Sequence, residues 1–458
     1  MPDIEFSLDP QPVPTVETEN RSIHTAIPAP GTREILERLA AVESRSMHGQ
    51  LPLVWDRAEG HNVYDAAGNR WIDMTSTIFV ANVGHSNQRV AQALRDAIDR
   101  PLQSCYAYGN EVRARYLERL TAFAGFPFEK AFLLSAGTEA TEAVFKLMRM
   151  HGQSVGRRRL GVVCVEGNWH GRTLGAQMMS GNQGQKAWVG YQDADIHHIP
   201  FPYPWEVAEG QGAAFLVRSL EALAERGLDP AKDLCGVMLE TFQGWGAVFY
   251  PEDWVQAISE ECQRHGLLLA FDEMQSGFGR TGRRFGYEHY GVTPDLLACG
   301  KGMGGGVPLS GVLGRAEVMD LPGVGNMSST HSANPLVCSA GLAVLDELDG
   351  RDLIRESERR GALMHRALDD MMQAHPGRID SILGRGMIAA ILVRDPETGA
   401  PDSAFASRVS ERAMQKGVLV VHTGRESIKL GPPLTISDEA LIEAVAVIEE
   451  CVQECEVE

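Results

Sequence analysis

The sequence predicts an α/β protein in which a large domain with a mostly parallel sheet is joined to a smaller α+β domain. Short apolar runs separated by helical patterns lie in the middle of the chain, at 131–134, 160–165, 235–239, 267–271 and 296–299. Such runs, each followed by a Gly-rich or polar turn, are typical of strands buried on both faces of a helix-covered parallel sheet. Beyond about residue 340, helical patterns surround the strand-like segments 387–393 and 418–421, which indicates the second domain.

Composition excludes several classes of protein. The formal net charge of −19 argues against a nucleic-acid partner, which needs a basic surface. This charge could favour cationic amine substrates, although solubility is its simpler explanation. No apolar run is long enough to span a membrane, and the acidic N-terminus lacks the order of a secretory signal. The eight cysteines are scattered without a Cys-x-x-Cys pair, so we expect no metal site, no disulfide framework and a cytoplasmic location.

The residues that follow the apolar runs carry the chemistry, because ligands of parallel sheets bind beyond the carboxyl ends of the strands. After the first run, Gly137 and Thr138 open a helix, which predicts a phosphate site or, alternatively, an ordinary helix cap. After the second run, Trp169 offers a flat face for stacking and Arg172 could clamp a carboxylate. A core tryptophan and a surface arginine are the alternative interpretation of this pair.

The fourth run delivers Asp272 to its carboxyl end. A buried carboxylate needs a cationic partner, and the protonated pyridine nitrogen of a ligand is one such partner. A structural ion pair with Arg280 or Arg283 is the other, and the sequence leaves both interpretations open.

Lys301, one of seven lysines, stands between Gly300 and Gly302 after the fifth run. Glycine neighbours are poor in helices and strands but let a planar molecule approach the ε-amine, and a desolvated lysine amine can form a Schiff base. The alternative is a solvated loop lysine. The Gly-x-Gly-x-x-Gly pattern ending at Gly305 also suggests an NAD-type oxidoreductase, but a Pro-interrupted segment follows where that motif needs a helix. A phosphate site, a stacking aromatic, a buried Asp and this lysine are together what a pyridoxal phosphate enzyme needs.

With these motifs the chain resembles the class III (ω-) aminotransferases of fold type I, and among them the 4-aminobutyrate aminotransferase-like members. The likeness runs from about Pro52 to Ile448, with the motifs in the family order. They span residues 135–140, 169–173, 240–244, 271–282, Lys301 and 329–335. The resemblance implies the fold type I architecture of pyridoxal-phosphate-dependent transferases, with a small domain formed from both ends of the chain.

The resemblance implies roles for four residues around the cofactor ring. Lys301 would hold pyridoxal 5′-phosphate as a Schiff base and, once released, act as the general base of a proton shift. Asp272 would pair with the pyridinium nitrogen. Gln275 would contact the ring hydroxyl, and Trp169 would stack on the ring where the family usually has Tyr or Phe.

The remaining cofactor-binding residues follow from the same resemblance. Gly137 and Thr138 would bind the phosphate. Thr330 would reach that phosphate from the neighbouring subunit, which implies a homodimer or a dimer of dimers with shared active sites. His170 and Glu240, which belong to the same motifs, are assigned to the cofactor site as well.

The resemblance and the residue patterns together divide the chain into four parts. Residues 1–30, rich in Pro, Thr and Glu, are expected to form an extended arm that a second subunit could order. Residues 31–75, with a helical pattern over 34–47, form the N-terminal part of the small domain. Residues 76–345 form the large cofactor-binding domain, and residues 346–458 complete the small domain.

The substrate side departs from the family pattern. Members that use 4-aminobutyrate or ornithine carry a Glu and a late Arg that open together to admit an α-carboxylate. Here Trp245 stands at the position of the Glu and Lys429 at that of the Arg, which Arg425 could take over only with a local shift. Trp cannot form an ion pair, and Lys lacks the planar fork of Arg. Arg172, whose counterpart grips the distal carboxylate, is retained.

We therefore expect an aminotransferase with an ω-amino acid or another primary amine as donor and a 2-oxo acid, 2-oxoglutarate or pyruvate, as acceptor. A polyamine or amino sugar donor is the alternative that Trp245 and the acidic composition suggest. Epimerisation or decarboxylation on the same fold is a further alternative, because such enzymes share the cofactor contacts.

Overall fold

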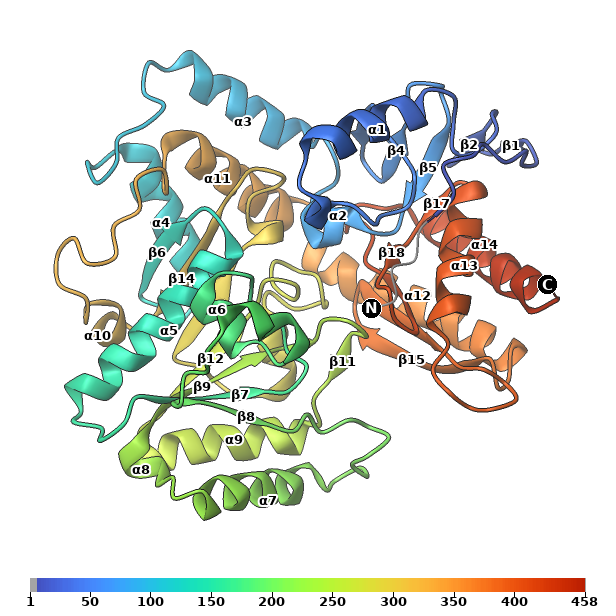
Figure 1. Ribbon diagram of the computed structural model, residues 1–458. Coiled ribbons are helices and arrows are strands. Elements are labelled where there is room, and N and C mark those ends of the chain that lie inside the picture. Colours follow the sequence, from blue (N-terminus) through green and yellow to red (C-terminus); the bar gives the residue numbers. More distant parts are fainter. Residues whose placement is uncertain (1–5, 458) are drawn as a thin grey trace.

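The computed structural model describes residues 6–457, and its largest feature is a seven-stranded sheet (Figure 1). All neighbouring strands pair in parallel except at β14, which is antiparallel to both of its neighbours. In spatial order the strands are β6 (Lys130–Leu134), β14 (Ser310–Gly314), β13 (Leu296–Cys299), β12 (Leu268–Asp272), β9 (Leu234–Glu240), β7 (Gly161–Val165) and β8 (Ile196–Ile199). Each predicted apolar run falls on one of these strands, and the predicted mostly parallel sheet is confirmed.

Both faces of this sheet are buried, as the continuous apolar runs predict. On β12, Leu268 and Ala270 belong to the core beneath α5, whereas Leu269 and Phe271 belong to the core on the opposite face. The helices are α5 (Gly137–Ser154) on the first face, α4 (Glu111–Ala124), α7 (Gly212–Glu225), α9 (Glu252–His265) and α11 (Pro335–Gly350) on the second, and α3 (Gln88–Asp99) packed on α11. Because helices cover both faces of the sheet, a ligand site is expected at the carboxyl ends of the strands.

A second, antiparallel sheet lies beside the large one (Figure 1). Its strands are β15 (Ile379–Arg385), β16 (Ile388–Val393), β19 (Ser427–Leu430) and β18 (Val421–His422). Its helices are α12 (Leu353–Ala374), α13 (Ser403–Gln415) and α14 (Asp438–Val457). This part of the chain has the α+β composition that the sequence predicts.

A third sheet brings the two ends of the chain together. Its strands are β1 (Val16–Glu17), β2 (Ser22–Ile23), β5 (Arg70–Asp73), β4 (Asn62–Tyr64), β3 (Arg57–Glu59) and β17 (Val418–Leu419). Strand β17 pairs in parallel with β5, so the C-terminal segment completes an N-terminal sheet. Residues 418–421 are therefore two strands in different sheets rather than one, because the chain passes from β17 to β18 at Val420.

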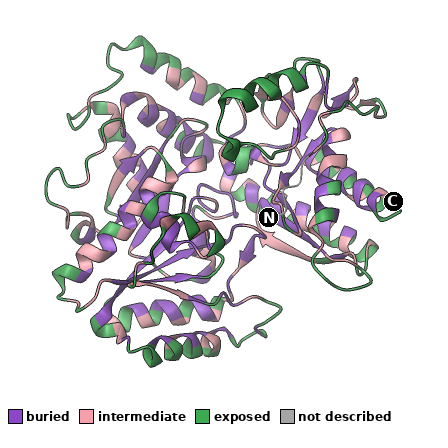
Figure 2. Ribbon diagram, in the orientation of Figure 1, coloured by how far each residue is buried: buried purple, intermediate pink, exposed green. Residues whose placement is uncertain are grey.

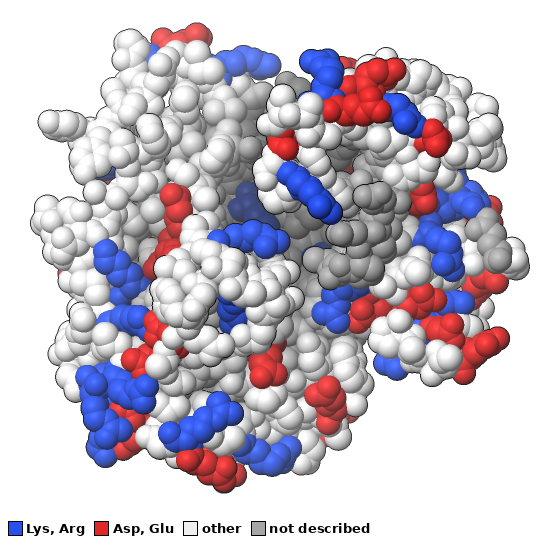
Figure 3. Space-filling view, in the orientation of Figure 1, with Lys and Arg blue, Asp and Glu red and all other residues white. Residues whose placement is uncertain are grey.

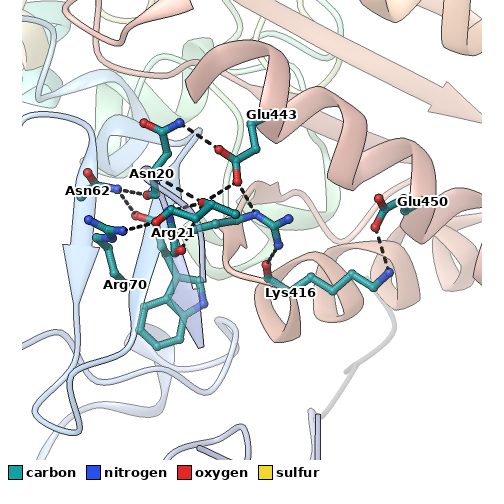
Figure 4. A network of polar contacts seen from close by, with 9 residues as sticks. Asn20, Arg21, Asn62, Arg70, Lys416, Glu443 and Glu450 are labelled. Carbon is teal, nitrogen blue, oxygen red and sulfur yellow. Dashed lines mark hydrogen bonds and ion pairs between the residues drawn. The ribbon is translucent and has the colours of Figure 1, made fainter. Parts of the chain in front are cut away.

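The described part of the N-terminal arm is anchored to its own chain (Figure 4). Glu443 on α14 accepts hydrogen bonds from Thr18 Oγ1 at 2.7 Å, Asn20 Nδ2 at 2.8 Å and Arg21 Nε at 2.8 Å. Burial opposes ionisation of this carboxyl, but the three hydrogen bonds outweigh it and lower the pKa of Glu443. The arm thus contacts the C-terminal helix of its own chain.

Short elements complete the fold. They are α1 (Thr32–Val42), η1 (Arg45–Met47), α2 (Ser76–Phe79), α6 (Leu174–Met179), η2 (Gly184–Val189), α8 (Pro230–Asp233), β10 (Phe242–Gln243), β11 (Val248–Phe249), η3 (Gly286–Tyr290), η4 (Lys301–Met303) and α10 (Ala316–Met319). Helix α1 is shorter than the predicted 34–47 because Glu43 has an extended backbone, and it buries only Thr32 (Figure 2). Among residues 6–457, no helix combines the length and the apolarity needed to cross a bilayer.

Candidate active site

Three titratable side chains meet at the carboxyl ends of adjacent strands. Asp272 ends β12, Glu240 ends β9, and Lys301 begins η4 just after β13. Asp272 lies in register with Glu240 on one side and Ala298 on the other. Burial lowers the pKa of Lys301, while the nearby Asp272 and Glu240 carboxyls oppose this shift. The parallel strands therefore deliver an amine and two carboxyls to one place.

His170 is the polar partner of Asp272. Its Nδ1 lies 3.0 Å from Asp272 Oδ2, and both side chains are almost completely buried. Arg283 pairs instead with Glu358 at 2.9 Å, and Arg280 bonds to groups at the junction between the two domains. The alternative interpretation of Asp272 as the ion-pair partner of Arg280 or Arg283 is therefore wrong.

The glycines beside Lys301 are explained by what packs behind them. A Cβ on Gly300 would lie 2.6 Å from Met274 Sδ, and one on Gly302 would lie 2.4 Å from Asn82 Nδ2. Lys301 itself has a φ of +47°, a left-handed conformation that costs a residue with a side chain free energy. The surrounding packing thus fixes a strained turn that points the lysine at the site.

A chain of hydrogen bonds runs along the other side of the site. The Trp169 backbone N–H donates to Glu240 Oε2 at 2.9 Å, and Gln275 Nε2 donates to Glu240 Oε1 at 3.3 Å. Lys429 Nζ donates to Gln275 Oε1 at 3.1 Å and to the Gly244 carbonyl at 2.6 Å. Burial raises the pKa of Glu240 to about 8 and lowers the pKa of Lys429 to about 7.

The predicted phosphate site lies at the N-terminus of α5. Thr138 Oγ1 is 2.6 Å from Thr173 Oγ1 and accepts the Thr173 N–H at 3.2 Å, which ties the start of α5 to the segment before α6. A Cβ on Gly171 would lie 2.3 Å from Thr138 Oγ1, so this close approach requires glycine. The N–H groups of Gly137 and Thr138 are in the first turn of α5, where a helix supplies no carbonyl acceptors.

Trp169 and Arg172 lie against each other near the mouth of the site. The Arg172 guanidinium is exposed and its Cζ is 4.4 Å from the centre of the half-buried Trp169 ring. Figure 3 shows a hollow between the segments around α2 and α6, with Lys and Arg side chains at its rim. Arg172 lies two residues before the start of α6.

Trp245 and Arg425 form a second stacked pair. Arg425 Cζ lies 3.7 Å from the centre of the Trp245 ring, and its guanidinium pairs with Glu426 at 3.0 Å. The Trp245 indole N–H donates to Gln243 Oε1 at 2.6 Å. Arg425 is exposed, whereas Lys429 lies buried beside Gln275. The two candidates for the position of the family's late Arg therefore lie in different environments.

Thr330 does not join the other predicted residues within this chain. It is exposed in the loop between α10 and α11, which lies at the outer edge of the large sheet (Figure 1). Val324 in the same loop is fully exposed. The loop is thus available to a second copy of the chain.

Sequence reasoning missed the turn that brings Phe79 to the site. The consecutive residues of α2, Ser76–Phe79, have φ values of 42°, 53°, 59° and 70°. Left-handed turns of non-glycine residues are rare, so no residue pattern predicts one here. The Phe79 ring is buried, and its centre lies 4.9 Å from Lys429 Nζ and 5.3 Å from Arg280 Cζ.

Comparison with known proteins identifies the family. The profile of the family described as "Aminotransferase class-III" matches residues 43–452. The chain belongs to this family. It is 32% identical over 447 residues to a 4-aminobutyrate aminotransferase of Mycobacterium tuberculosis, covering 94% of this chain and 97% of that one.

Two other relatives show the range of the family. A leucine/methionine racemase of Thermococcus litoralis is 31% identical over 433 residues, covering 92% of this chain and 96% of that one. The solved ornithine aminotransferase of Toxoplasma gondii has 26% identity and a TM-score of 0.82, covering 93% of this chain and 95% of that one, and its crystals contained PLP at partial occupancy in the active site. The predicted fold type I architecture is confirmed.

The aminotransferase is an enzyme that depends on pyridoxal 5′-phosphate. The side chains at the strand ends fit this group chemically. Asp272 is a buried acceptor for a protonated ring nitrogen, and Lys301 supplies a half-buried amine of lowered pKa. The first turn of α5 supplies N–H donors for a phosphate.

Proposed function

We propose that this aminotransferase moves the amino group of an ω-amino acid or another primary amine to 2-oxoglutarate or pyruvate, in two successive half-reactions. The observation that carries the proposal is the convergence of Lys301 with the Asp272–His170 and Glu240–Gln275 pairs at the ends of three adjacent strands. Relatives named 4-aminobutyrate, 5-aminovalerate and acetylornithine aminotransferase support an ω-amino donor.

The Asp272–His170 and Glu240–Gln275 pairs would hold the cofactor ring. Asp272 would accept a hydrogen bond from the ring nitrogen and keep it protonated, with His170 fixing the carboxylate through the 3.0 Å contact. Gln275, which donates a hydrogen bond to Glu240, would face the ring hydroxyl. When bound, the cofactor supplies an electron sink for the carbon that carries the amino group.

The phosphate and the ring face would be held by residues outside the strand ends. Gly137 and Thr138 would donate to the phosphate from the first turn of α5. Trp169 would stack on the ring, since its half-buried indole adjoins Glu240 through its own backbone N–H. Thr330 would complete the phosphate site of a second subunit.

Lys301 performs the proton transfers. Its lowered pKa leaves more of the amine unprotonated at neutral pH, which is the form that accepts a proton from the substrate carbon. The resulting ammonium then returns a proton to the second position of the shift.

The substrate side is lined by Arg172 and Trp245. Arg172 at the mouth would bind the distal carboxylate of an ω-amino acid, releasing the Trp169 face on which it rests. Trp245 and Arg425 would border the opposite end, where their stacking replaces an acidic partner. A polyamine or amino sugar remains the competing donor, because neither of these aromatic surfaces requires a carboxylate.

Assembly as a homodimer or dimer of dimers completes the proposal. Helix α1 exposes Ile35, Leu39 and Val42, and the Thr330 loop exposes Val324, all of which a second copy could cover (Figure 2). In this proposal the chain consists of an arm of residues 1–30, a small domain formed by residues 31–75 and 346–458, and a large domain of residues 76–345. The eight cysteines, seven of them buried, form no disulfide among the described residues, which supports a cytoplasmic location.

The test uses absorbance of the purified holoenzyme with a panel of donors: 4-aminobutyrate, ornithine, putrescine and an amino sugar. The expected result is loss of the cofactor's visible band with an ω-amino acid and its return with 2-oxoglutarate or pyruvate. A protein that binds no pyridoxal phosphate, or whose band no amine changes, would overturn the proposal.

Racemisation is the second candidate, favoured by the similarity to the leucine/methionine racemase. A racemase returns the proton to the carbon from which it came and keeps the amino group on its substrate. Loss of optical rotation of an amino acid without any 2-oxo acid would identify it, whereas amino transfer between two molecules would exclude it.

A further inference from the structure

Lys429 is a buried cation whose hydrogen-bonding capacity is taken up by the protein. Only 5% of the residue is exposed. An ammonium has three donors, and here two of them reach protein oxygens: the Gly244 carbonyl at 2.6 Å and Gln275 Oε1 at 3.1 Å. The third side of the amine faces the Phe79 ring, whose centre is 4.9 Å away. No side of this amine is left for a substrate carboxylate.

Phe79 is held firmly in that place. The left-handed turn of α2 is tied by Ser76, whose hydroxyl donates to the Gly431 carbonyl at 2.6 Å and accepts from Arg280 at 3.1 Å. A Cβ on Gly431 would lie 2.0 Å from Phe79 Cε1, so the ring fills the space beside the strand that carries Lys429. Opening Lys429 to a ligand would require this packed turn to move.

Lys429 instead determines how the Gln275 amide is oriented. An amide has one acceptor end and one donor end, and these can be assigned from their partners. The amine of Lys429 requires the oxygen of Gln275 on its side, which leaves the Gln275 nitrogen to donate to Glu240 Oε1 at 3.3 Å. Lys429 therefore sets which end of the Gln275 amide donates and which accepts in the hydrogen-bonded series Lys429–Gln275–Glu240–Trp169.

We propose that Lys429 is a positioning residue of the cofactor site, which orients Gln275 and places a positive charge near the Lys301 nitrogen, and that it is not a carboxylate receptor. The inference rests on the proposed function, which assigns this site to the cofactor. It implies that Arg172 is the principal carboxylate receptor, so that a monocarboxylic acceptor such as pyruvate needs no contact with Lys429.

The charges around Lys429 support an electrostatic role. Glu240 on β9 attracts its ammonium, and Lys301 after β13 repels it. Arg280 stacks on the same Phe79 ring, and Asp272 interacts with both Glu240 and Lys301. Because burial and Lys301 both disfavour the charge, the pKa of Lys429 falls to about 7.

The test compares holoenzymes of the wild type, Lys429→Met and Lys429→Gln. Methionine removes both charge and donor, whereas glutamine removes the charge and keeps an N–H for the Gly244 carbonyl. The pH titration of the bound cofactor's absorbance, without substrate, is expected to shift upward by about one unit in both variants, because loss of a nearby cation favours protonation of the Lys301 nitrogen. The dissociation constant of the cofactor is expected to rise more in Lys429→Met than in Lys429→Gln.

Lys186→Met is the matched control. Like Lys429, Lys186 has a lowered pKa and donates to a backbone carbonyl, that of Met178 at 3.0 Å. It is half-buried and lies outside the site. Its removal is expected to leave the titration midpoint unchanged.

Steady-state kinetics separates positioning from substrate binding. In both Lys429 variants the KM for pyruvate and for 2-oxoglutarate is expected to stay within about twofold of the wild-type value while kcat falls. A tenfold rise in either KM, or an unchanged titration midpoint in both variants, would overturn the inference. Failure of the proposed function would show differently, as a wild-type holoenzyme that transfers no amino group, and the absorbance titration would still decide the role of Lys429.

Discussion

The two halves of the site are built in different ways. On the cofactor half, Asp272, Glu240 and Lys301 each follow directly on a buried parallel strand, so their positions are dictated by the sheet. On the other half, Phe79 and Lys429 are brought together by packing between segments far apart in the chain. The sheet therefore sets the position of the first half, whereas the second half depends on contacts between distant segments of the chain.

The largest effect is expected from removing the amine on the cofactor half. Lys301→Ala should lower the rate of amino transfer by roughly 10⁴-fold, the upper end of what one acid–base group contributes. It should also abolish covalent attachment of the cofactor, measured by borohydride reduction and mass spectrometry. Attachment at another lysine would break the assignment of the strand ends as the reactive half.

Asp272→Asn should have the next largest effect. The amide keeps the shape of the side chain but cannot hold a ring nitrogen protonated by charge, so kcat should fall by roughly 100-fold or more. The cofactor should still bind covalently to Lys301, which absorbance would show. Full activity in this variant would mean that the contact between Asp272 and His170 is structural only.

The strand ends could be predicted from the sequence because each apolar run marks where its strand stops. Asp272 and Lys301 were identified in this way, and so was the mostly parallel sheet. The contact between His170 and Asp272 was not visible, since it joins residues 102 apart in the chain. Nothing in the residue types of α2 indicates a left-handed turn, so Phe79 was missed, and the contacts of Lys429 depend on it.

The glycines beside Lys301 show how packing restricts even the cofactor half. Gly302→Ala would place a Cβ 2.4 Å from Asn82 Nδ2, and Asn82 is fixed by its bonds to Arg280 at 2.7 Å and the Phe278 carbonyl at 3.0 Å. We expect a loss of about 1–3 kcal/mol in the free energy of unfolding, measured by denaturant titration.

Gly350→Ala is the matched control for Gly302→Ala, because a Cβ added to Gly350, at the end of α11, would have no other atom within 4 Å. It should leave the free energy of unfolding unchanged or raise it slightly, since alanine is the better helix residue. Equal stability of the two variants would show that Asn82 can move, and that the lysine turn is less constrained than the strand ends it adjoins.

The smallest effect is expected on the pH dependence of the free energy of unfolding, measured on protein freed of cofactor. Glu240 and Lys429 should change this dependence with opposite signs. The pKa of Glu240 rises from 4.5 to about 8 on folding, so between these values the folded state binds more protons and Glu240 makes stability fall as pH rises. The pKa of Lys429 drops from 10.5 to about 7, so in that interval the unfolded state binds more protons and Lys429 makes stability rise with pH.

Substitution at each position should therefore change the pH profile of unfolding in opposite directions. Glu240→Gln should remove a downward slope below pH 8, and Lys429→Met should remove an upward slope above pH 7, each by no more than about 1.4 kcal/mol per pH unit. Chemical denaturation at a series of pH values measures both. Slopes that change in the same direction would mean that the two groups titrate as one unit. The division of the site into two halves would then not hold at Gln275, which links Glu240 to Lys429.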